Sequence, residues 1–263
     1  MDLGIKGKVA LVTAASKGLG RASAEELSRE GCRLAICART TADIERVAGE
    51  ISQETGNEVV PFTADMSKEK DINDLLEGVR KKLSDPEILV VNAGGPPPGN
   101  YDSTPLDAYP AAIELTLMSG VRLTHGCLPA MRKQGWGRIV FISSISVKQP
   151  IPFILLSNMA RAGLTGFMKT VASEIAASGV TLNAVLPGSH LTDRVRQTAE
   201  KRAADQNTTV EKLLETQAAT IPMKRIGEAR ELAAVVAFLA SARASFITGA
   251  SIQNDGGAFM GLL

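Results

Sequence analysis

The feature that most constrains the fold lies near the N-terminus, where a short apolar segment runs into two closely spaced glycines. Residues 9–12 are apolar and partly β-branched, which is typical of a strand buried on both faces. Gly18 and Gly20 allow a tight turn, and a helix is expected from about Leu19. The free N–H groups and the positive dipole end of such a helix favour an anion. The pattern therefore predicts a dinucleotide pyrophosphate site at this turn.

Strand-like and helix-like segments alternate along the rest of the chain. Strands are expected over residues 9–12, 33–38, 59–62, 88–91, 138–142, 180–186 and 251–253. Apolar residues recur between them at helical spacing, and one long helix is expected over residues 106–133, with a break near Pro110. Apolar strands that alternate with helices predict a parallel sheet covered on both faces. We therefore expect residues 1–263 to form a single doubly wound α/β domain with seven parallel strands.

Residues that could bind or react follow the ends of these strands. In chain order they are the glycine turn, Arg39, Asp65, Asn92, Ser144 and Pro187-Gly188. In a doubly wound sheet, ligands bind at the carboxyl ends of the strands. Because all six features fall at strand ends of one polarity, we expect them to surround a single site.

Composition argues against several classes of function. A net charge of +1 over 263 residues gives no field that would attract nucleic acid or an anionic membrane. No apolar stretch approaches the length that spans a bilayer, and the first residues lack the apolar run of a signal peptide. The three cysteines form no Cys-x-x-Cys pattern, which favours buried thiols in a reducing compartment. We therefore expect a cytoplasmic protein without a metal site.

Several stretches, taken as an ordered set, resemble one known family. They are Thr13 to Gly20, Asn92-Ala93-Gly94, Gly137 to Ser144, Val180 to Gly188, and Ile247-Thr248-Gly249 with Asp255-Gly256-Gly257. The set resembles the short-chain dehydrogenase/reductases, and among them the branch that is similar to 3-oxoacyl-acyl-carrier-protein reductases. One departure is Ala14, which stands where the family usually has glycine. The resemblance implies a Rossmann domain that transfers hydride between a nicotinamide cofactor and a carbonyl or alcohol substrate, as a homotetramer.

The resemblance also implies which residues would contact the cofactor. They are Thr13, Ser16, Lys17, Gly18, Leu19, Gly20, Arg39, Asp65, Met66, Asn92, Ala93, Gly94, Arg161, Pro187, Gly188 and Thr192. Asp65 and Met66 would flank the adenine, although Asp65 is nearly as typical of a turn carboxylate before Ser67. The residues from Pro187 to Thr192 would hold the nicotinamide end.

The end of the second expected strand bears on the choice between the two nicotinamide cofactors. An NAD site usually has a carboxylate about twenty residues past the glycines, which accepts a hydrogen bond from the ribose 2′-hydroxyl. Here the sequence has Arg39 instead, and Lys17 lies within the turn. Two cations suit a ribose 2′-phosphate, so NADP(H) is preferred over NAD(H). The alternative is that both are ordinary solvated cations.

The catalytic positions are where the chain departs from the family. The family uses asparagine, serine, tyrosine and lysine, with tyrosine thirteen residues after the serine and lysine four residues later. If Ser144 is the serine, these positions hold Ser157 and Arg161, and the asparagine position holds Thr116. Three of the four catalytic side chains therefore differ from the family pattern.

The replacement of tyrosine by serine changes the acid–base chemistry. A tyrosine hydroxyl has a pKa near 10, whereas a serine hydroxyl resembles water, whose pKa is about 15.7. That gap corresponds to roughly 7–8 kcal/mol, so Ser157 is no simple substitute. Arg161 stays protonated, and it could instead stabilise an oxyanion. A water held by Ser144, Ser157 and Arg161 could relay the proton.

Two functions therefore stay open from the sequence. The first is an oxidoreductase that acts on a 3-oxoacyl-like carbonyl or the matching alcohol, with an altered proton relay. The second is a protein that binds the nicotinamide cofactor without transferring hydride, as a structural or sensing partner. A substrate lid is expected over about residues 189–222, where His190 could face the substrate or be a solvated loop residue. Neither reading involves nucleic acid or a membrane.

Overall fold

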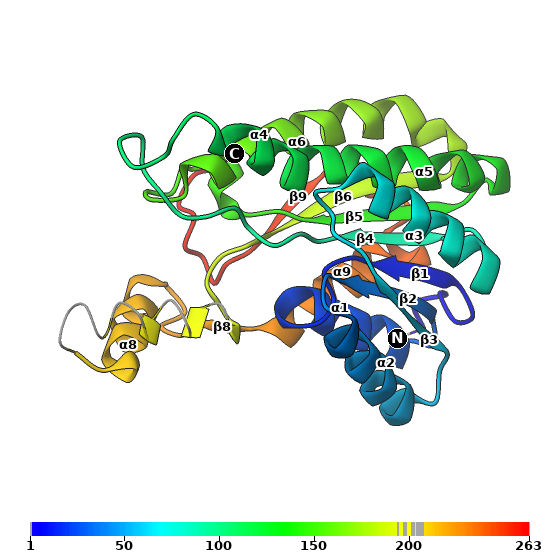
Figure 1. Cartoon of the computed structure of the whole chain (residues 1–263), viewed down its shortest axis with the longest axis horizontal. Helices are drawn as coiled ribbons and strands as arrows, with labels where there is room; N and C mark the ends of the chain where they lie inside the picture. Colours follow the sequence, from blue (N-terminus) through cyan, green and yellow to red (C-terminus); the bar gives the residue numbers. More distant parts are fainter. Residues whose placement is uncertain (1, 194, 197–198, 201–202, 204–207, 263) are drawn as a thin grey trace.

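The computed structural model describes all residues except 1, 194, 197–198, 201–202, 204–207 and 263. Its core is a parallel seven-stranded sheet in the order β3-β2-β1-β4-β5-β6-β9 (Figure 1). The strands are β1 (Val9–Val12), β2 (Arg33–Ala38), β3 (Val59–Thr63), β4 (Ile88–Val91), β5 (Gly137–Ile142), β6 (Val180–Pro187) and β9 (Ser251–Asn254). The predicted doubly wound α/β domain with seven parallel strands is confirmed.

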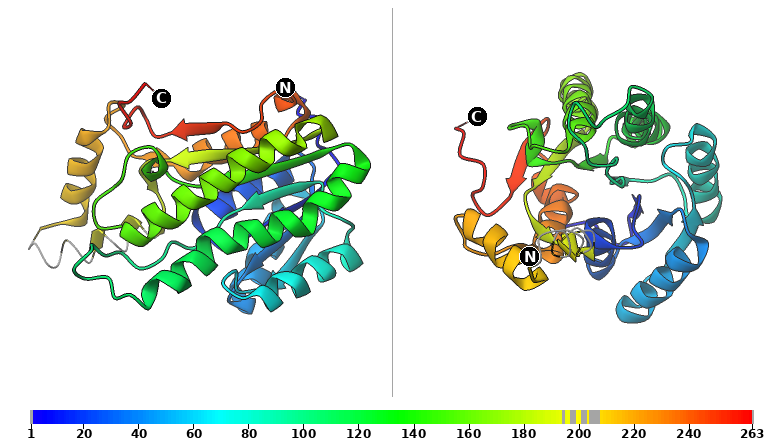
Figure 2. Two further views of the ribbon diagram at one scale, coloured as in Figure 1. Left: turned by 90° about the horizontal axis from the view of Figure 1, so that it is seen from above. Right: turned by 60° about the vertical axis from the view of Figure 1, so that its left-hand side comes forward.

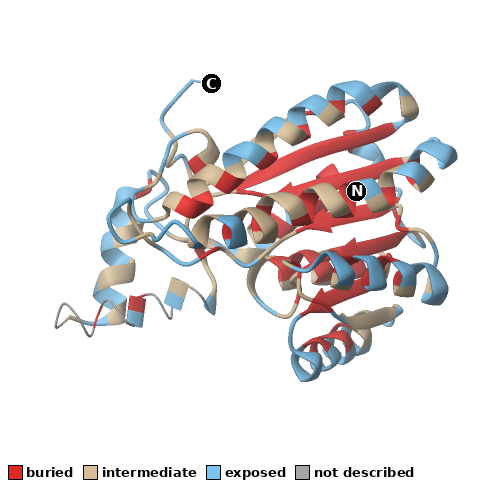
Figure 3. Cartoon of the chain, turned by 45° about the horizontal axis from the view of Figure 1, so that its top comes forward, coloured by how far each residue is buried: buried red, intermediate tan, exposed pale blue. Residues whose placement is uncertain are grey.

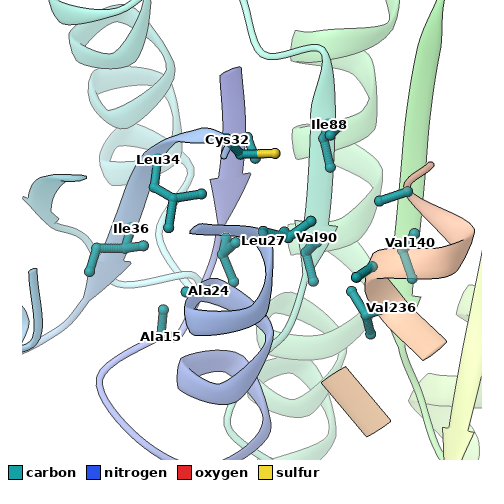
Figure 4. Packing of buried hydrophobic residues seen from close by; sticks show 14 of the residues in the cluster. Ala15, Ala24, Leu27, Cys32, Leu34, Ile36, Ile88, Val90, Val140 and Val236 are labelled. Atoms are coloured by element: carbon teal, nitrogen blue, oxygen red, sulfur yellow. The ribbon is translucent and has the colours of Figure 1, made fainter. Parts of the chain in front are cut away.

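Helices cover both faces of this sheet. One face carries α1 (Gly18–Arg29), α2 (Thr41–Thr55) and α9 (Ala229–Leu239). The other carries α3 (Glu69–Lys82), α5 (Ser119–Gln134) and α6 (Leu155–Ile175). Because side chains alternate along a strand, Val12 packs on the first face and Leu11 on the second. Figure 3 shows the buried strands between helices whose outer surfaces are exposed, and Figure 4 shows Ala24 and Leu27 of α1 packed on the strands.

The long helix expected over residues 106–133 is present, but its irregularity is not at the proline. It consists of α4 (Ala108–Ala112), a π-helical segment η1 (Ile113–Met118) and α5. Pro110 lies in the first turn of α4, where its missing N–H has no helical partner to lose. The expected break near Pro110 was therefore wrong, and the π-helical turn instead surrounds Thr116.

The segment after β6 leaves the sheet and returns to it. It begins with β7 (His190–Leu191), which pairs in parallel with β8 (Gly227–Glu228), and it contains α8 (Val210–Thr220). Figure 2 places α8 at the same end of the molecule as the C-terminus. Part of the lid expected over about residues 189–222 lies outside the described residues.

Three short 3-10 helices complete the described chain: η2 (Ile145–Val147), η3 (Ala176–Ser178) and η4 (Ala242–Ala244). Of these, η2 follows β5 directly and therefore lies at the carboxyl end of the sheet. Among the described helices, none combines the length and the apolar character needed to cross a bilayer.

Candidate functional site

The glycine turn between β1 and α1 is built by close backbone packing. A Cβ on Gly20 would collide with the carbonyl oxygen of Ala14 and would lie 2.6 Å from Nδ2 of Asn92. Asn92 Nδ2 donates a hydrogen bond to that same carbonyl oxygen at 3.2 Å. Ala14 itself has φ +49°, in the left-handed region that glycine adopts most easily. The family preference for glycine at this position thus has a physical reason, and this chain forms the turn with a strained alanine.

The start of α1 is suited to an anion. Lys17 at the N-cap makes no side-chain capping bond, and the first turn of α1 contains no acidic residue. Unsatisfied N–H groups and the helix dipole therefore meet no competing carboxylate from this first turn. This is the geometry that a pyrophosphate requires.

Thr13 has a bracing role below the turn. Its Oγ1 donates to the carbonyl oxygen of Asn92 at 2.7 Å and accepts from the N–H of Asn92 at 2.9 Å. Thr13 is fully buried, so it joins the ends of β1 and β4. The sequence analysis included Thr13 among the expected cofactor contacts, and that contact stays a prediction.

A cavity of about 600 Å³ opens beside this turn. Its lining includes Ser16, Lys17 and Gly18 of the turn, Arg39 at the end of β2, and Thr192 beyond β7. The structure thus brings together five of the predicted cofactor residues from three separate parts of the chain.

Among the described residues, four cations and three carboxylates line this cavity: Lys17, Arg21, Arg39 and Arg46, and Glu25, Asp43 and Asp193. Of these cations, Arg21 and Arg46 pair with Glu25 and Glu50. Within the described part of the chain, the side chains of Lys17 and Arg39 form no salt bridge. The sequence analysis missed Arg21 and Arg46, although their glutamates at i+4 are a readable signal of helix-surface pairs.

Asp65 is held as a turn carboxylate. Its Oδ1 accepts from the N–H of Ser67 at 3.0 Å and from Oγ of Ser67 at 2.8 Å. Burial raises the pKa of this carboxyl, but the hydrogen bonds from Ser67 and the charge of Arg39 outweigh it, so the pKa is lowered. Neither Asp65 nor the buried Met66 belongs to the described lining of the 600 Å³ cavity.

The three candidate catalytic residues converge on the carboxyl end of β5. Arg161 Nε donates to Ser157 Oγ at 3.1 Å, one turn earlier in α6. Arg161 Nη1 donates to the carbonyl oxygens of Ile142 at 3.0 Å and Ser143 at 2.8 Å. Ser144 Oγ accepts from the N–H of Ser146 at 3.1 Å and caps η2. The guanidinium therefore joins α6 to the strand end that carries Ser144.

Buried polar atoms without a protein partner gather around this strand end. Of five such side-chain atoms in the described chain, four lie on η1, η2, α6 or the end of β5: Thr116 Oγ1, Ser143 Oγ, Ser146 Oγ and Asn158 Oδ1. Both η1 and η2 pack against α6. Buried polar groups usually find a partner in protein, ordered water or ligand, so these atoms leave room for water or a polar ligand group at this strand end.

The rim of the site is fixed by backbone pairing. The N–H of Gly99 donates to the carbonyl of Phe153 at 2.8 Å, and the N–H of Leu155 donates to the carbonyl of Gly99 at 3.2 Å. The proline-rich segment after Asn92 is thereby joined to the residues that precede Ser157. Phe153 and Tyr101 on this rim are 67% and 82% exposed, which gives the rim an apolar surface.

The residues after β6 complete the site. A Cβ on Gly18 would lie 3.5 Å from Cγ2 of Thr192, so Thr192 lies against the glycine turn. His190 is buried, which rules out the solvated loop residue considered from the sequence. Among the described residues, no group of three or more histidine, cysteine or acidic side chains could hold a metal ion.

Comparisons with known proteins agree with this geometry. The sequence model of a family described as enoyl-(acyl carrier protein) reductase matches residues 13–258. The chain is 34% identical over 258 residues to the 3-oxoacyl-acyl-carrier-protein reductase of Pseudomonas aeruginosa, which covers 98% of this chain and 100% of that protein.

Solved structures give the same result. L-sorbose reductase from Gluconobacter frateurii, complexed with NADPH and L-sorbose, superposes with a TM-score of 0.96 at 32% identity over 100% of both chains. YwfH, an NADPH-dependent reductase involved in bacilysin biosynthesis, superposes with a TM-score of 0.93 at 29% identity over 98% of this chain and 100% of its own.

Proposed function

The chain belongs to the short-chain dehydrogenase/reductase family, and on that premise we propose that it is an NADP(H)-dependent reductase of a 3-oxoacyl-like carbonyl, or a dehydrogenase of the matching alcohol. The observation that carries the proposal is the joint presence of the cofactor cradle and the Ser157–Arg161 pair at the carboxyl end of one sheet. Either part alone would fit a simple binding protein.

The choice of NADP(H) rests on charge. The 2′-phosphate of NADP(H) needs cations beside the adenosine ribose, and the same cavity is lined by Lys17 of the glycine turn and Arg39 after β2, neither of which forms a salt bridge among the described side chains. Charge-assisted bonds to phosphate are the strong class of hydrogen bond. L-sorbose reductase, the actinorhodin ketoreductase and YwfH are all described with NADPH, which supports the same choice.

The proposed chemistry assigns separate tasks to the residues. When bound, the reduced cofactor supplies the hydride that adds to the carbonyl carbon. The hydroxyls of Ser144 and Ser157 each accept an N–H bond in the protein, which leaves their own hydrogens to donate to the substrate oxygen. Arg161 places a fixed positive charge behind Ser157 and stabilises the negative charge that develops on that oxygen. A water held by Ser144, Ser157 and Arg161 would relay a proton from bulk solvent to that oxygen, so that the relay water regains the proton it gives up.

The exposed aromatic rim supports an apolar acyl or ring substituent on the substrate. Tyr101 and Phe153 border the site beside α6, and Lys148 lies on the loop after η2 with Nζ 5.4 Å from the ring centre of Phe259. An apolar rim with one cation nearby is poorly matched to a polyhydroxylated sugar such as L-sorbose. It suits a carbonyl compound with an apolar chain better.

A second function is favoured by one specific observation. Arg161 donates hydrogen bonds from Nη1 to two backbone carbonyls and from Nε to Ser157, as would a residue whose only role is to join α6 to β5. The protein would then bind the cofactor without transferring hydride.

Assembly and location remain proposals based on the family resemblance. β9 forms one edge of the sheet, and the fully exposed Phe246 precedes it, which supports further association into a homotetramer. Light scattering after size-exclusion chromatography measures the assembly directly. A cytoplasmic location stays a prediction of the sequence.

The test of function separates binding from chemistry. Calorimetry measures the affinity for NADPH, and the decrease in absorbance of NADPH then reports turnover on a panel of 3-oxoacyl thioesters, diketones and quinones. The oxidoreductase proposal expects turnover that Arg161→Ala abolishes. Tight NADPH binding without turnover on any substrate would favour the binding protein, and no binding of either nicotinamide cofactor would reject both functions.

A further inference from the structure

His190 lies at the start of the segment that leaves the sheet after β6. It is the first residue of β7, and only 5% of its surface is exposed. Its Nε2 is 2.7 Å from Oδ1 of Asn254, the last residue of β9. A polar side chain buried to this degree normally has a specific partner, and this short contact joins two elements 64 residues apart in sequence.

The imidazole is enclosed by a glycine on its other side. A Cβ on Gly227 of β8 would lie 3.0 Å from both Cδ2 and Nε2 of His190. β8 is the strand that pairs with β7 through His190–Gly227 and Leu191–Glu228. The ring is therefore held between the sheet edge at Asn254 and the returning strand at Gly227, and a larger side chain at residue 227 would displace it.

The backbone around His190 supplies only part of the attachment. The N–H of Gly188 donates to the carbonyl of Asn254 at 3.0 Å, and the N–H of Gly227 donates to the carbonyl of Ser189 at 2.9 Å. Three residues of the chain that follows, Leu191 to Asp193, line the 600 Å³ cavity together with Ser16, Lys17 and Gly18.

We propose that His190 is a positioning residue whose hydrogen bond to Asn254 fixes residues 191–193 over the glycine turn. It thereby sets the contact that this segment makes with the distal half of the cofactor, which is the nicotinamide and its ribose. The inference rests on the proposed nicotinamide cofactor and extends it. Thr192 is the residue that places this segment against the turn, because its Cγ2 would lie 3.5 Å from a Cβ on Gly18. Arg39, which would hold the adenosine end, follows β2 and lines the same cavity, so we expect the adenosine end to depend less on this segment.

The experiment compares two amides of different reach. In His190→Gln the amide nitrogen falls near the position of Nε2 and keeps the bond to Asn254, whereas in His190→Asn the shorter amide does not reach it. A third variant, Asn254→Leu, removes the side-chain amide that shares this hydrogen bond. For each, calorimetry measures the affinity for NADPH and for adenosine 2′,5′-bisphosphate, which contains the adenosine end but lacks the distal half.

The proposal expects a selective loss. His190→Asn and Asn254→Leu should weaken NADPH binding about tenfold, the value of one lost buried hydrogen bond. Both should leave the affinity for adenosine 2′,5′-bisphosphate within about twofold, and His190→Gln should restore NADPH binding. A general loss of structure would weaken both ligands together, so the ratio of the two affinities isolates positioning.

Three results would overturn the inference. The first is equal NADPH affinity in His190→Gln and His190→Asn. The second is an equal loss of affinity for NADPH and for adenosine 2′,5′-bisphosphate, and the third is no loss of NADPH affinity in His190→Asn and Asn254→Leu. If Asn254→Leu does not fold, the Gln and Asn pair decides by itself, because both are small polar replacements for the imidazole. Failure of the unaltered protein to bind NADPH would instead refute the proposed function, which the same titration distinguishes.

Discussion

Replacement of Gly20 by alanine should break the cofactor cradle. In the interior of a helix, alanine is favoured over glycine by about 1 kcal/mol, so propensity alone predicts stabilisation. At Gly20 the added methyl group would meet the carbonyl oxygen of Ala14 and lie 2.6 Å from Nδ2 of Asn92. Such a contact forces backbone or side chain to shift, and real Cβ atoms essentially never approach this closely.

The cost can be worked from these contacts. Overpacking of a close-packed site costs about 1–3 kcal/mol. The shift also strains or breaks the bond from Asn92 Nδ2 to Ala14, worth about 0.5–1.5 kcal/mol. Against the gain from propensity, we expect a net loss of about 1–3 kcal/mol in the free energy of unfolding. Because α1 must move away from β4, NADPH affinity should fall as well.

A matched substitution provides the control. Gly49 lies inside α2, and a Cβ there would have no neighbour within 4 Å. Gly49→Ala should therefore raise stability by up to about 1 kcal/mol and leave NADPH binding unchanged. Urea denaturation with and without NADPH measures both quantities. The reasoning fails if Gly20→Ala is as stable as Gly49→Ala, or if it binds NADPH as tightly as the unaltered protein.

Four further outcomes are expected. Arg39→Asp should lower the ratio of NADP to NAD affinity about tenfold or more, since it removes a charge-assisted bond to phosphate; an unchanged ratio in calorimetry would refute NADP preference. Ser157→Tyr combined with Arg161→Lys should raise the turnover rate by restoring an acid of lower pKa, and a steady-state assay that finds no gain would count against correct presentation of substrate. Burial raises the pKa of all three cysteine thiols, Cys32, Cys37 and Cys127, to about 12. At pH 8, 5,5′-dithiobis(2-nitrobenzoate) should therefore modify these thiols only after the protein has unfolded. The hydrogen bonds from Arg225 lower the pKa of Glu231 to about 2. The carboxylate therefore stabilises the fold above its unfolded pKa of about 4.3, and this contribution is lost as the pH falls toward 2. In urea denaturation, Glu231→Gln should lower the free energy of unfolding clearly at pH 7 and leave it unchanged near pH 2.

The fold could be read from the sequence because its signals are local and repeat. Strands such as residues 9–12 are apolar throughout, since both faces of a parallel sheet are covered, and the helices between them are amphipathic. The handedness of the crossovers then leaves few topologies, which placed the glycine turn, Arg39 and Ser144 at one edge. The position of the irregularity in the long helix could not be read, because a π-helical turn around Thr116 depends on packing against α6.

The site was predictable in its composition and not in its contacts. The sequence supplied the residue types at the positions that we predict to be catalytic, where the resemblance implies that Ser157 and Arg161 depart from the family pattern. It could not tell that Arg161 would reach the carbonyls of Ile142 and Ser143, because a long side chain has many rotamers and only the surrounding fold selects one.

By itself, the sequence determined the order of strands and helices, the family, and the identity of the groups around the glycine turn. Tertiary structure alone decided that His190 is buried against Asn254, that Thr13 braces β4 from below, and that Asp65 serves its own turn. The physical reason is range. Hydrophobic periodicity and turn chemistry act over a few residues and are written in the sequence, whereas the partner of a buried polar group is whichever distant atom the completed fold brings within about 3 Å.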